Sequence, residues 1–170
     1  MTVNGISDGF KQGARDILPA ALIVGMAKGV IIMLGGDNPA EPSVLNTMLN
    51  AAGGLVSDVP VAVSAWIMYV FQAVFNFFIV SGSGQAALTM PLMSPLADMA
   101  GVTRQVAVLA FQLGDGFTNM IVPTSGALMG TLGAARIEWS KWFKFQIKFQ
   151  LLLFILASIV IVTAVLIGFK

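Results

Sequence analysis

The sequence contains neither cysteine nor histidine. A thiol nucleophile, an imidazole base, a Cys/His zinc site and a disulfide framework are therefore all excluded. Charge is scarce too, because Asp, Glu, Lys and Arg make up only 10% of the 170 residues, against about 25% in a soluble domain. The net charge of +1 provides no basic surface for a nucleic acid, so no nucleic-acid partner is expected.

Apolar residues, by contrast, are abundant. They make up 57% of the chain, and the mean hydropathy is +0.89. A surface with so few charges would not keep a domain of this size in solution. The composition therefore predicts an integral membrane protein, all α-helical and multi-pass.

Apolar runs and polar interruptions divide the single membrane domain, residues 1–170, into segments. We expect a polar cytoplasmic lead over 1–16, a span over 17–34, a surface helix over 43–56, a re-entrant hairpin over 59–100, a broken span over 104–135 and a last span over 145–169. The first and last spans can cross a hydrocarbon layer of about 30 Å, whereas the surface helix is too short. Lys28, inside the first span, can either pair with an anion or extend its ammonium group to the interface.

The hairpin is predicted because its second apolar arm, residues 86–100, is a poor membrane span. The arm is short and contains Pro91 and Pro95. Irregular backbone at membrane depth is tolerated where protein buries it or water fills a cavity, so two arms meeting at a small polar tip indicate re-entry. An ordinary turn between two spans is the alternative. The tip residues are Ser81, Gly82, Ser83, Gly84 and Gln85.

A second polar interruption divides residues 104–135, which are too long for one straight span and too short for two spans and a turn. A carboxylate at the bilayer centre costs about 2.5–3.5 kcal/mol, so Asp115 is a candidate functional group unless this stretch is a loop outside the bilayer. Gln72 and Asn76, four residues apart, can bind a carboxylate or a neighbouring helix. The polar residues of the interruption are Gly114, Asp115, Gly116, Thr118, Asn119, Pro123, Thr124 and Ser125.

Positive charges predict the orientation. They precede the first and the last span, so the positive-inside rule places residues 1–16 and 136–148 in the cytoplasm. The hairpin then enters from the outer side. Trp139 and Trp142 are expected in the headgroup layer, as aromatic residues beside cations commonly are. The cations are Lys11, Arg15, Arg136, Lys141, Lys144 and Lys148.

The order of these parts resembles one repeat of the ion transporter superfamily. The likeness is clearest over residues 80–137, which read VSGSGQAALTMPLMSPLADMAGVTRQVAVLAFQLGDGFTNMIVPTSGALMGTLGAARI. This stretch looks like the C-terminal half of the anaerobic four-carbon dicarboxylate carrier (DcuC-like) family and its YfcC-type relatives, some of which are described as basic amino acid antiporters. The likeness extends loosely upstream through DGFKQGARDILPAALIVGMAKGV.

The resemblance implies two inverted repeats in a bacterial cytoplasmic (inner) membrane, with the site between hairpin tips and broken helices. It implies that the tip and interruption residues named above bind substrate or ion. Their oxygen atoms suit Na⁺, and Asp115 can carry H⁺; no cofactor is implied. The expected partners are a small-molecule substrate, membrane lipids, and a first-repeat polypeptide or a second copy of the chain.

We therefore expect the C-terminal half of a secondary active transporter. Its substrate would be a small organic anion or an amino acid, either a four-carbon dicarboxylate or a basic amino acid, coupled to Na⁺ or H⁺. The alternative is a non-transporting assembly or regulatory subunit, or the remnant of an interrupted carrier gene. An enzyme is not expected, because without His or Cys a nucleophile and base would have to come from Asp115 with Ser or Thr.

Overall fold

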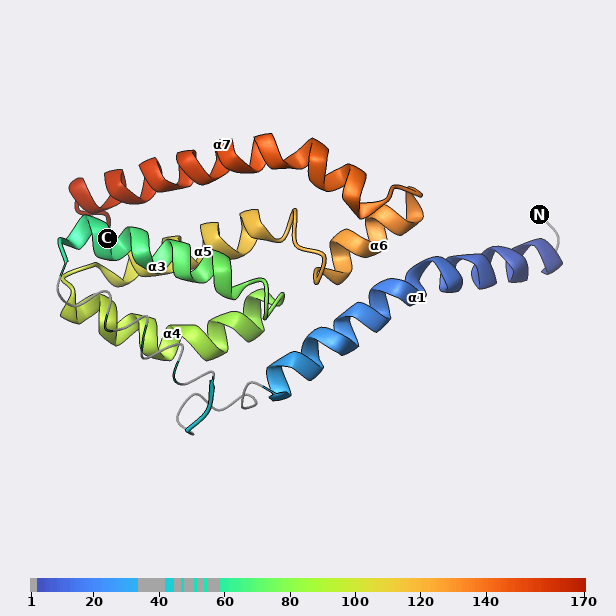
Figure 1. Cartoon of the computed structure of the whole chain (residues 1–170), viewed down its shortest axis with the longest axis horizontal. Coiled ribbons are helices and arrows are strands. Elements are labelled where there is room, and N and C mark those ends of the chain that lie inside the picture. The colour runs from blue at the N-terminus through green and yellow to red at the C-terminus, as the bar shows by residue number, and fades with distance from the viewer. Residues whose placement is uncertain (1–2, 34–41, 45–46, 48–50, 52–53, 55–58) are drawn as a thin grey trace.

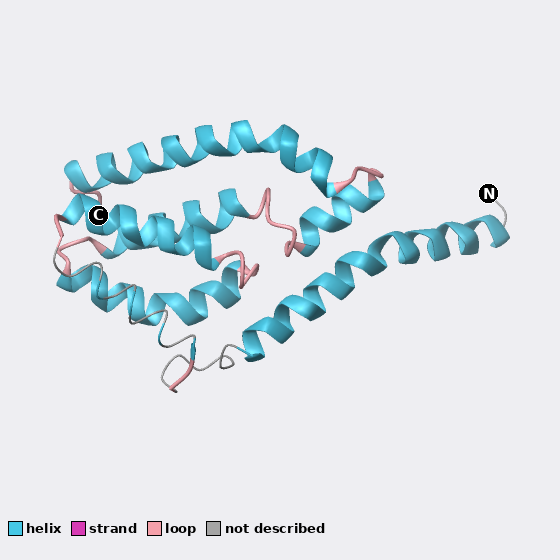
Figure 2. Cartoon of the chain, in the orientation of Figure 1, coloured by secondary structure: helices cyan, strands magenta, loops and turns pink. Residues whose placement is uncertain are grey.

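The structure, a computed structural model, describes residues 3–33, 42–44, 47, 51, 54 and 59–170. Its secondary structure within these residues is helical, as the sequence predicted (Figures 1 and 2). The surface helix predicted over 43–56 lies largely outside the described residues. The helices are α1 (Val3–Met33), α3 (Val61–Phe75), α4 (Gly82–Met99), α5 (Arg104–Thr118), α6 (Gly126–Ala134) and α7 (Trp139–Leu166).

Helix α7 is the long apolar helix of the fold. It has 28 residues, and its most apolar window has a mean hydropathy of 2.7. Among the described residues it is the one helix both long and apolar enough to cross a membrane. Its stripe of Ala157, Ile161 and Ala164 is buried, whereas Phe149 and Ile155 are exposed. One face of α7 therefore packs on the other helices, and the opposite face suits lipid.

The core forms where α3 and α5 pack together beneath α7, with α4 on the other side (Figure 1). Many of the buried side chains are alanines, which allow helices to approach closely. The ring of Tyr69 on α3 lies 5.3 Å from that of Phe154 on α7. The main buried residues are Ala65, Met68, Tyr69, Met93, Ala97, Val106, Ala107, Ala110, Ala157 and Ile161.

Four helix ends meet at one end of this core: the start of α3, the end of α4, the start of α5 and the end of α7 (Figure 1). Arg104 at the start of α5 pairs with Asp98 near the end of α4, with 2.7 Å between Nη2 and Oδ2. Thr103 donates its hydroxyl to the carbonyl of Phe169 at 2.7 Å. Its oxygen also accepts from the Val106 amide, so Thr103 is the N-cap of α5. These contacts join the end of α4, the start of α5 and the C-terminal end of α7.

The hairpin turn lies earlier in the chain than the sequence predicted. Helix α3 ends at Phe75 and α4 begins at Gly82, so the turn is residues 76–81. Ser81 accepts a hydrogen bond from the Gly84 amide and caps α4. The SGSGQ residues are thus the cap and first turn of α4, because a serine that satisfies a free amide favours the start of a helix.

The interruption of the broken stretch lies later than predicted. Helix α5 continues through Gly114 and Asp115 to Thr118, and the chain between α5 and α6 covers residues 119–125, called the break below. Gly114 lies within α5, where the absence of a side chain lets the helix pack closely on α3. A Cβ atom at Gly114 would lie 2.8 Å from the Cβ atom of Gln72. Ser125 accepts from the Leu128 amide and caps α6.

Helix α1 joins the predicted lead and the first predicted span into one helix that begins at Val3. Near its start Lys11 and Asp8 are 3.8 Å apart. The helix packs against α6 and extends beyond the rest of the chain (Figure 1). The side chain of Lys28 is not among those that the structure describes. The membrane positions of all these segments stay predictions.

Candidate functional site

Asp115 is the centre of a polar cluster between the hairpin turn and the break. It lies near the end of α5, where its Oδ1 accepts from Asn119 Nδ2 at 3.0 Å. Asn76 Nδ2, just after α3, donates to the Asp115 carbonyl at 3.2 Å and to Asn119 Oδ1 at 3.1 Å. Two chain segments, the end of α3 and the end of α5, therefore contribute to one group of side chains, which we call the Asp115 cluster: Asn76, Asp115 and Asn119.

The first turn of α4 faces the carboxylate of this cluster. A Cβ atom on Gly82 would lie 3.1 Å from Asp115 Oδ2. Helix N-termini carry free amides and a partial positive charge, which stabilise a nearby carboxylate. The absence of a side chain at Gly82 lets the N-terminus of α4 approach Asp115. The first turn of α4 and the end of α5 thus lie together.

Three buried polar side chains hold the hairpin arms together beside the cluster. Gln85 on α4 donates Nε2 to the side chain of Gln72 on α3 at 2.7 Å and to its carbonyl at 2.9 Å. Gln72 donates in turn to Thr89 at 3.1 Å. All three side chains are almost completely buried. The interpretation of Gln72 as a contact between helices is confirmed, and Gln85, a predicted binding residue, is engaged between the arms.

Three buried amide oxygens find no hydrogen-bond partner among the described residues, namely Asn76 Oδ1, Gln85 Oε1 and Gln150 Oε1. The side chains of Asn76 and Gln85 are 0% exposed. A buried acceptor without a partner costs about 1–3 kcal/mol, so such atoms are unusual in a folded protein. One of these oxygens, Asn76 Oδ1, belongs to the Asp115 cluster.

The other predicted residues have different surroundings. Thr124 donates its hydroxyl to the Phe77 carbonyl at 3.0 Å and so connects the break to the hairpin turn. Ser81, Gly84 and Ser125 take part in helix caps, as described above, although each capping hydroxyl keeps a second lone pair. Thr118 and Pro123 are half-buried in or beside the break, whereas Ser83 and Gly116 are exposed. The structure does not bring the last two to the cluster.

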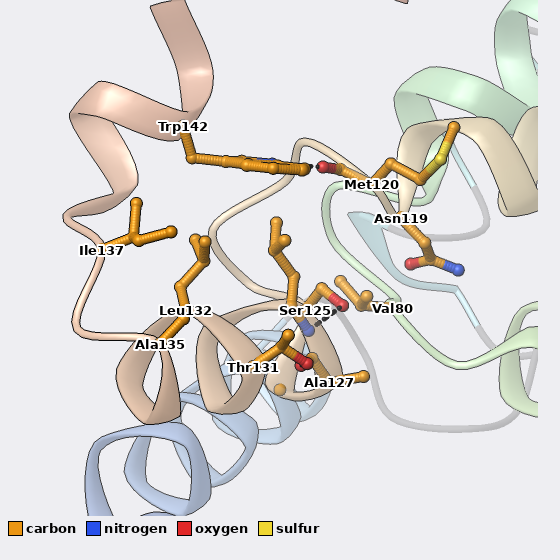
Figure 3. Close-up of a pocket in the computed structure, with 12 residues that line it drawn as sticks. Val80, Asn119, Met120, Ser125, Ala127, Thr131, Leu132, Ala135, Ile137 and Trp142 are labelled. Atoms are coloured by element: carbon orange, nitrogen blue, oxygen red, sulfur yellow. Dashed lines mark hydrogen bonds between the residues drawn. The ribbon is translucent and has the colours of Figure 1, made fainter. Parts of the chain in front are cut away.

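An open cavity of about 620 Å³ lies between the break, α6 and the first turns of α7 (Figure 3). Its walls are mainly apolar, with Trp142 above and Ser125 between Leu132 and Val80. Asn119 lines the cavity and also bonds to Asp115, so the cavity adjoins the cluster. The lining residues are Val80, Asn119, Met120, Ser125, Gly126, Ala127, Leu128, Thr131, Leu132, Ala135, Ile137 and Trp142.

Helix α7 supplies hydrogen-bond donors to the backbone around the break. The indole Nε1 of Trp139 donates to the Ile121 carbonyl at 3.0 Å, and that of Trp142 to the Met120 carbonyl at 2.8 Å. Gln150 Nε2 donates to the Phe117 carbonyl at 3.0 Å. The expectation that the two tryptophans lie in a headgroup layer stays a prediction.

The charge of the described site is negative. None of the cavity-lining residues is ionisable with a positive charge, and Asp115 is the charged member of the adjoining cluster. Within the described part of the chain, no three Asp or Glu side chains gather to hold a metal ion. One carboxylate with amide and carbonyl oxygens is a donor set suited to a monovalent cation or an organic ammonium group.

Comparisons with known proteins give a consistent result. The family described as "C4-dicarboxylate anaerobic carrier" matches residues 1–166. The chain is 52% identical over 169 residues to "Putative basic amino acid antiporter YfcC" of Escherichia coli (strain K12), covering 99% of this chain and 33% of that protein. It is 30% identical over 170 residues to an "Uncharacterized protein" of Haemophilus influenzae, covering 97% and 32% respectively. The chain spans about a third of the length of these curated relatives, and no solved structure matches.

Proposed function

The chain belongs to the C4-dicarboxylate anaerobic carrier family, and on that premise we propose that it forms the C-terminal part of a secondary active transporter in a bacterial cytoplasmic membrane. Residues 59–100 form the re-entrant hairpin of this carrier and residues 104–135 its broken helix. The Asp115 cluster is the cation-binding part of the transport site. The single observation that carries the proposal is the meeting of Asp115, Asn76, Asn119 and the N-terminus of α4 at the hairpin turn and break.

Helix lengths support the re-entrant arrangement. Helices α3 and α4 have 15 and 18 residues, and α4 contains two prolines. A membrane-spanning helix needs about 20 apolar residues, so α3 is too short to cross, and α4, with 18 residues, is not apolar enough. Gln150 contacts the end of α5, and it lies about 24 Å from the C-terminal end of α7 at about 1.5 Å per residue. The hairpin turn and the break therefore lie far from the end of the core at which α3 begins and α4 ends.

Charge supports a cationic ligand. A dicarboxylate would need positive groups, and the described residues around the site supply a carboxylate instead. We therefore favour a basic amino acid as substrate, whose cationic group binds Asp115. One carboxylate neutralises one cation at a time, so a coupling cation and a cationic substrate would compete for it. Such competition is the basis of exchange, in accord with the printed name of the Escherichia coli relative.

A four-carbon dicarboxylate is the second candidate, and the description of the family favours it. Asp115 and the unpaired Asn76 Oδ1 would then bind a coupling Na⁺, which in turn attracts the anion. Positive groups for the second carboxylate would come from the first repeat, which is proposed to complete the site. That repeat is either another part of a longer protein or a separate polypeptide.

A chimaera tests the proposal directly. In it, the 170 residues replace the segment that they match in the Escherichia coli relative, so that a complete carrier is present. Purified chimaera in proteoliposomes is assayed for binding and uptake of labelled arginine, lysine and succinate, under a Na⁺ gradient or a pH gradient. We expect saturable arginine or lysine uptake driven by one of these gradients.

Asp115→Asn in the chimaera should abolish this uptake, because the amide keeps the size of the side chain and loses its charge. Asp98→Asn is the matched control: Asp98 is an exposed aspartate paired with Arg104 at the outer end. It should transport normally. Succinate uptake without uptake of basic amino acids would identify a dicarboxylate as the substrate. If neither basic amino acids nor succinate bind saturably, the chain would be a non-transporting subunit and the proposal would be overturned.

A further inference from the structure

We propose that Trp139 and Trp142 are positioning residues that hold the break against α7 and thereby keep Asn119 in contact with Asp115. Neither indole touches the cluster itself. Each acts through the backbone of the two residues that follow Asn119. The structural content of this inference is independent of transport, whereas its effect on ion or substrate affinity rests on the proposed function.

The contacts involve consecutive residues of the break. The carbonyl of Met120 accepts from Trp142 at 2.8 Å, and the carbonyl of Ile121 accepts from Trp139 at 3.0 Å. An indole nitrogen is a donor only, so it is suited to satisfy a carbonyl and unsuited to bind a cation. Carbonyls released where a helix is interrupted need such donors, because lipid offers none.

One turn bond of the break is long. The amide of Met120 reaches the Phe117 carbonyl at 3.4 Å, whereas the amides of Asn119 and Ile121 reach the carbonyls of Asp115 and Thr118 at 3.0 Å. Asn119 is the C-cap of α5, and its side chain bridges Asp115 and Asn76 at 3.0 and 3.1 Å. The path of the chain directly after Asn119 therefore depends also on contacts outside this turn, and the indoles supply two of them.

Both indoles are themselves held in place on α7. The ring of Trp139 lies 5.1 Å from Phe143, and that of Trp142 lies 5.8 Å from Phe145. Aromatic pairs at these distances stabilise each other. Figure 3 shows the Trp142 ring above the cavity with its edge at the Met120 carbonyl. A rigid donor of this kind fixes the distance between α7 and the break.

Trp66 offers a matched control. Its indole also donates to a group on α7, the Ser158 hydroxyl at 2.9 Å, but this contact joins α3 to α7 far along the chain from the break. Replacing Trp66 by Phe removes one indole hydrogen bond and leaves the break untouched. An effect that substitution of each of the three tryptophans produces would thus indicate a general role in packing.

The chain has no cysteine, so single reporter cysteines can be added to the full chain in lipid nanodiscs. Val122→Cys reports on the break, because Val122 is 5% exposed, and Ala157→Cys reports on the core, because Ala157 is 1% exposed. The rate of maleimide labelling is measured for each reporter. The backgrounds are the parent chain, the Trp139→Phe/Trp142→Phe double variant, and Trp66→Phe.

We expect labelling of Val122→Cys to be about tenfold faster in the double variant, as the loss of two ordinary hydrogen bonds predicts. Labelling of Ala157→Cys should be unchanged there, and Trp66→Phe should change neither rate. An unchanged rate at Val122→Cys would overturn the inference. Faster labelling at both reporters would also overturn it, because the tryptophans would then support the whole fold and not the break.

A second measurement connects the positioning role to the site. In the chimaera, Trp142→Phe should raise the half-saturating concentration of the transported cation several-fold while the maximal rate changes less, and Trp66→Phe should leave both unchanged. A loss of maximal rate alone would contradict positioning of Asn119. Because labelling needs no transport, failure of the proposed function and failure of this inference give different results.

Discussion

Gly114 and Gly116 flank Asp115, yet the two positions differ completely. A Cβ atom at Gly114 would lie 2.8 Å from Gln72 Cβ and 2.9 Å from the amide nitrogen of Ala73, whereas one at Gly116 would meet nothing within 4 Å. The two glycines cannot be distinguished within the sequence motif GDG, so the sequence assigned both to the site. Only the packing of α5 on α3 shows that they differ.

Gly114→Ala should destabilise the fold by about 1–3 kcal/mol, because the added methyl group meets backbone that cannot move aside easily. Gly116→Ala is the matched control and should be neutral or slightly stabilising, since alanine favours a helix over glycine by about 1 kcal/mol. Thermal unfolding in detergent measures both. Equal effects of the two substitutions would contradict the close α3–α5 contact.

At the scale of elements, the sequence predicted the helical class, and the structure places its two non-helical stretches, residues 76–81 and 119–125, away from the predicted positions. Two features could not be predicted from the sequence. Ser81 and Ser125 cap α4 and α6, so the non-helical stretches are displaced from the polar residues that suggested them. The indole contacts of Trp139 and Trp142 join segments far apart in sequence, and no local pattern encodes such a pairing.

The hairpin arms are coupled through Gln72, Gln85 and Thr89. Gln72→Leu should cost about 1–3 kcal/mol, because it removes one of the two acceptors of the buried Gln85 Nε2 and the donor to Thr89. Adding Gln85→Leu should cost less than its effect in the parent chain, since the Gln85 amide has then already lost its side-chain partner. Unfolding of the single and double variants in detergent gives the coupling. Strictly additive effects would exclude a connected network.

The hairpin should also enter the membrane from the outer side. Val61 at the start of α3 is 38% exposed and Met99 at the end of α4 is 75% exposed, so cysteines there should both react with an impermeant maleimide from outside. A cysteine at Ser83, in the first turn of α4, should not react exclusively from the cytoplasm. Exclusive cytoplasmic labelling of Ser83→Cys in sealed vesicles would instead indicate two ordinary spans.

At the scale of the whole molecule, the described chain has two packed parts. Helices α3, α4, α5 and α7 form the core, and α6 packs against α1. The break and the two indole contacts connect them, and the cavity lies at this junction. The proposed site therefore lies at the junction of the two parts.

The last prediction is that this polypeptide does not transport by itself. The cavity is open, and a buried oxygen of Asn76 is without a partner among the described residues. The chain also spans about a third of its curated relatives. Polar groups facing hydrocarbon each cost several kcal/mol, and in the transporter proposed above a first repeat would cover the open cavity.

The test compares proteoliposomes that contain the purified 170-residue chain alone with proteoliposomes in which it is co-expressed with the remaining two thirds of the Escherichia coli relative, supplied as a separate polypeptide. We expect arginine or lysine uptake only from the second preparation, and its loss with Asp115→Asn. Antiparallel pairing of two copies would also rebuild the site, but it requires dual insertion, and the cations before both predicted end spans favour one orientation. Robust ion-coupled uptake by the chain alone would therefore contradict the shared site and point to a self-sufficient oligomer.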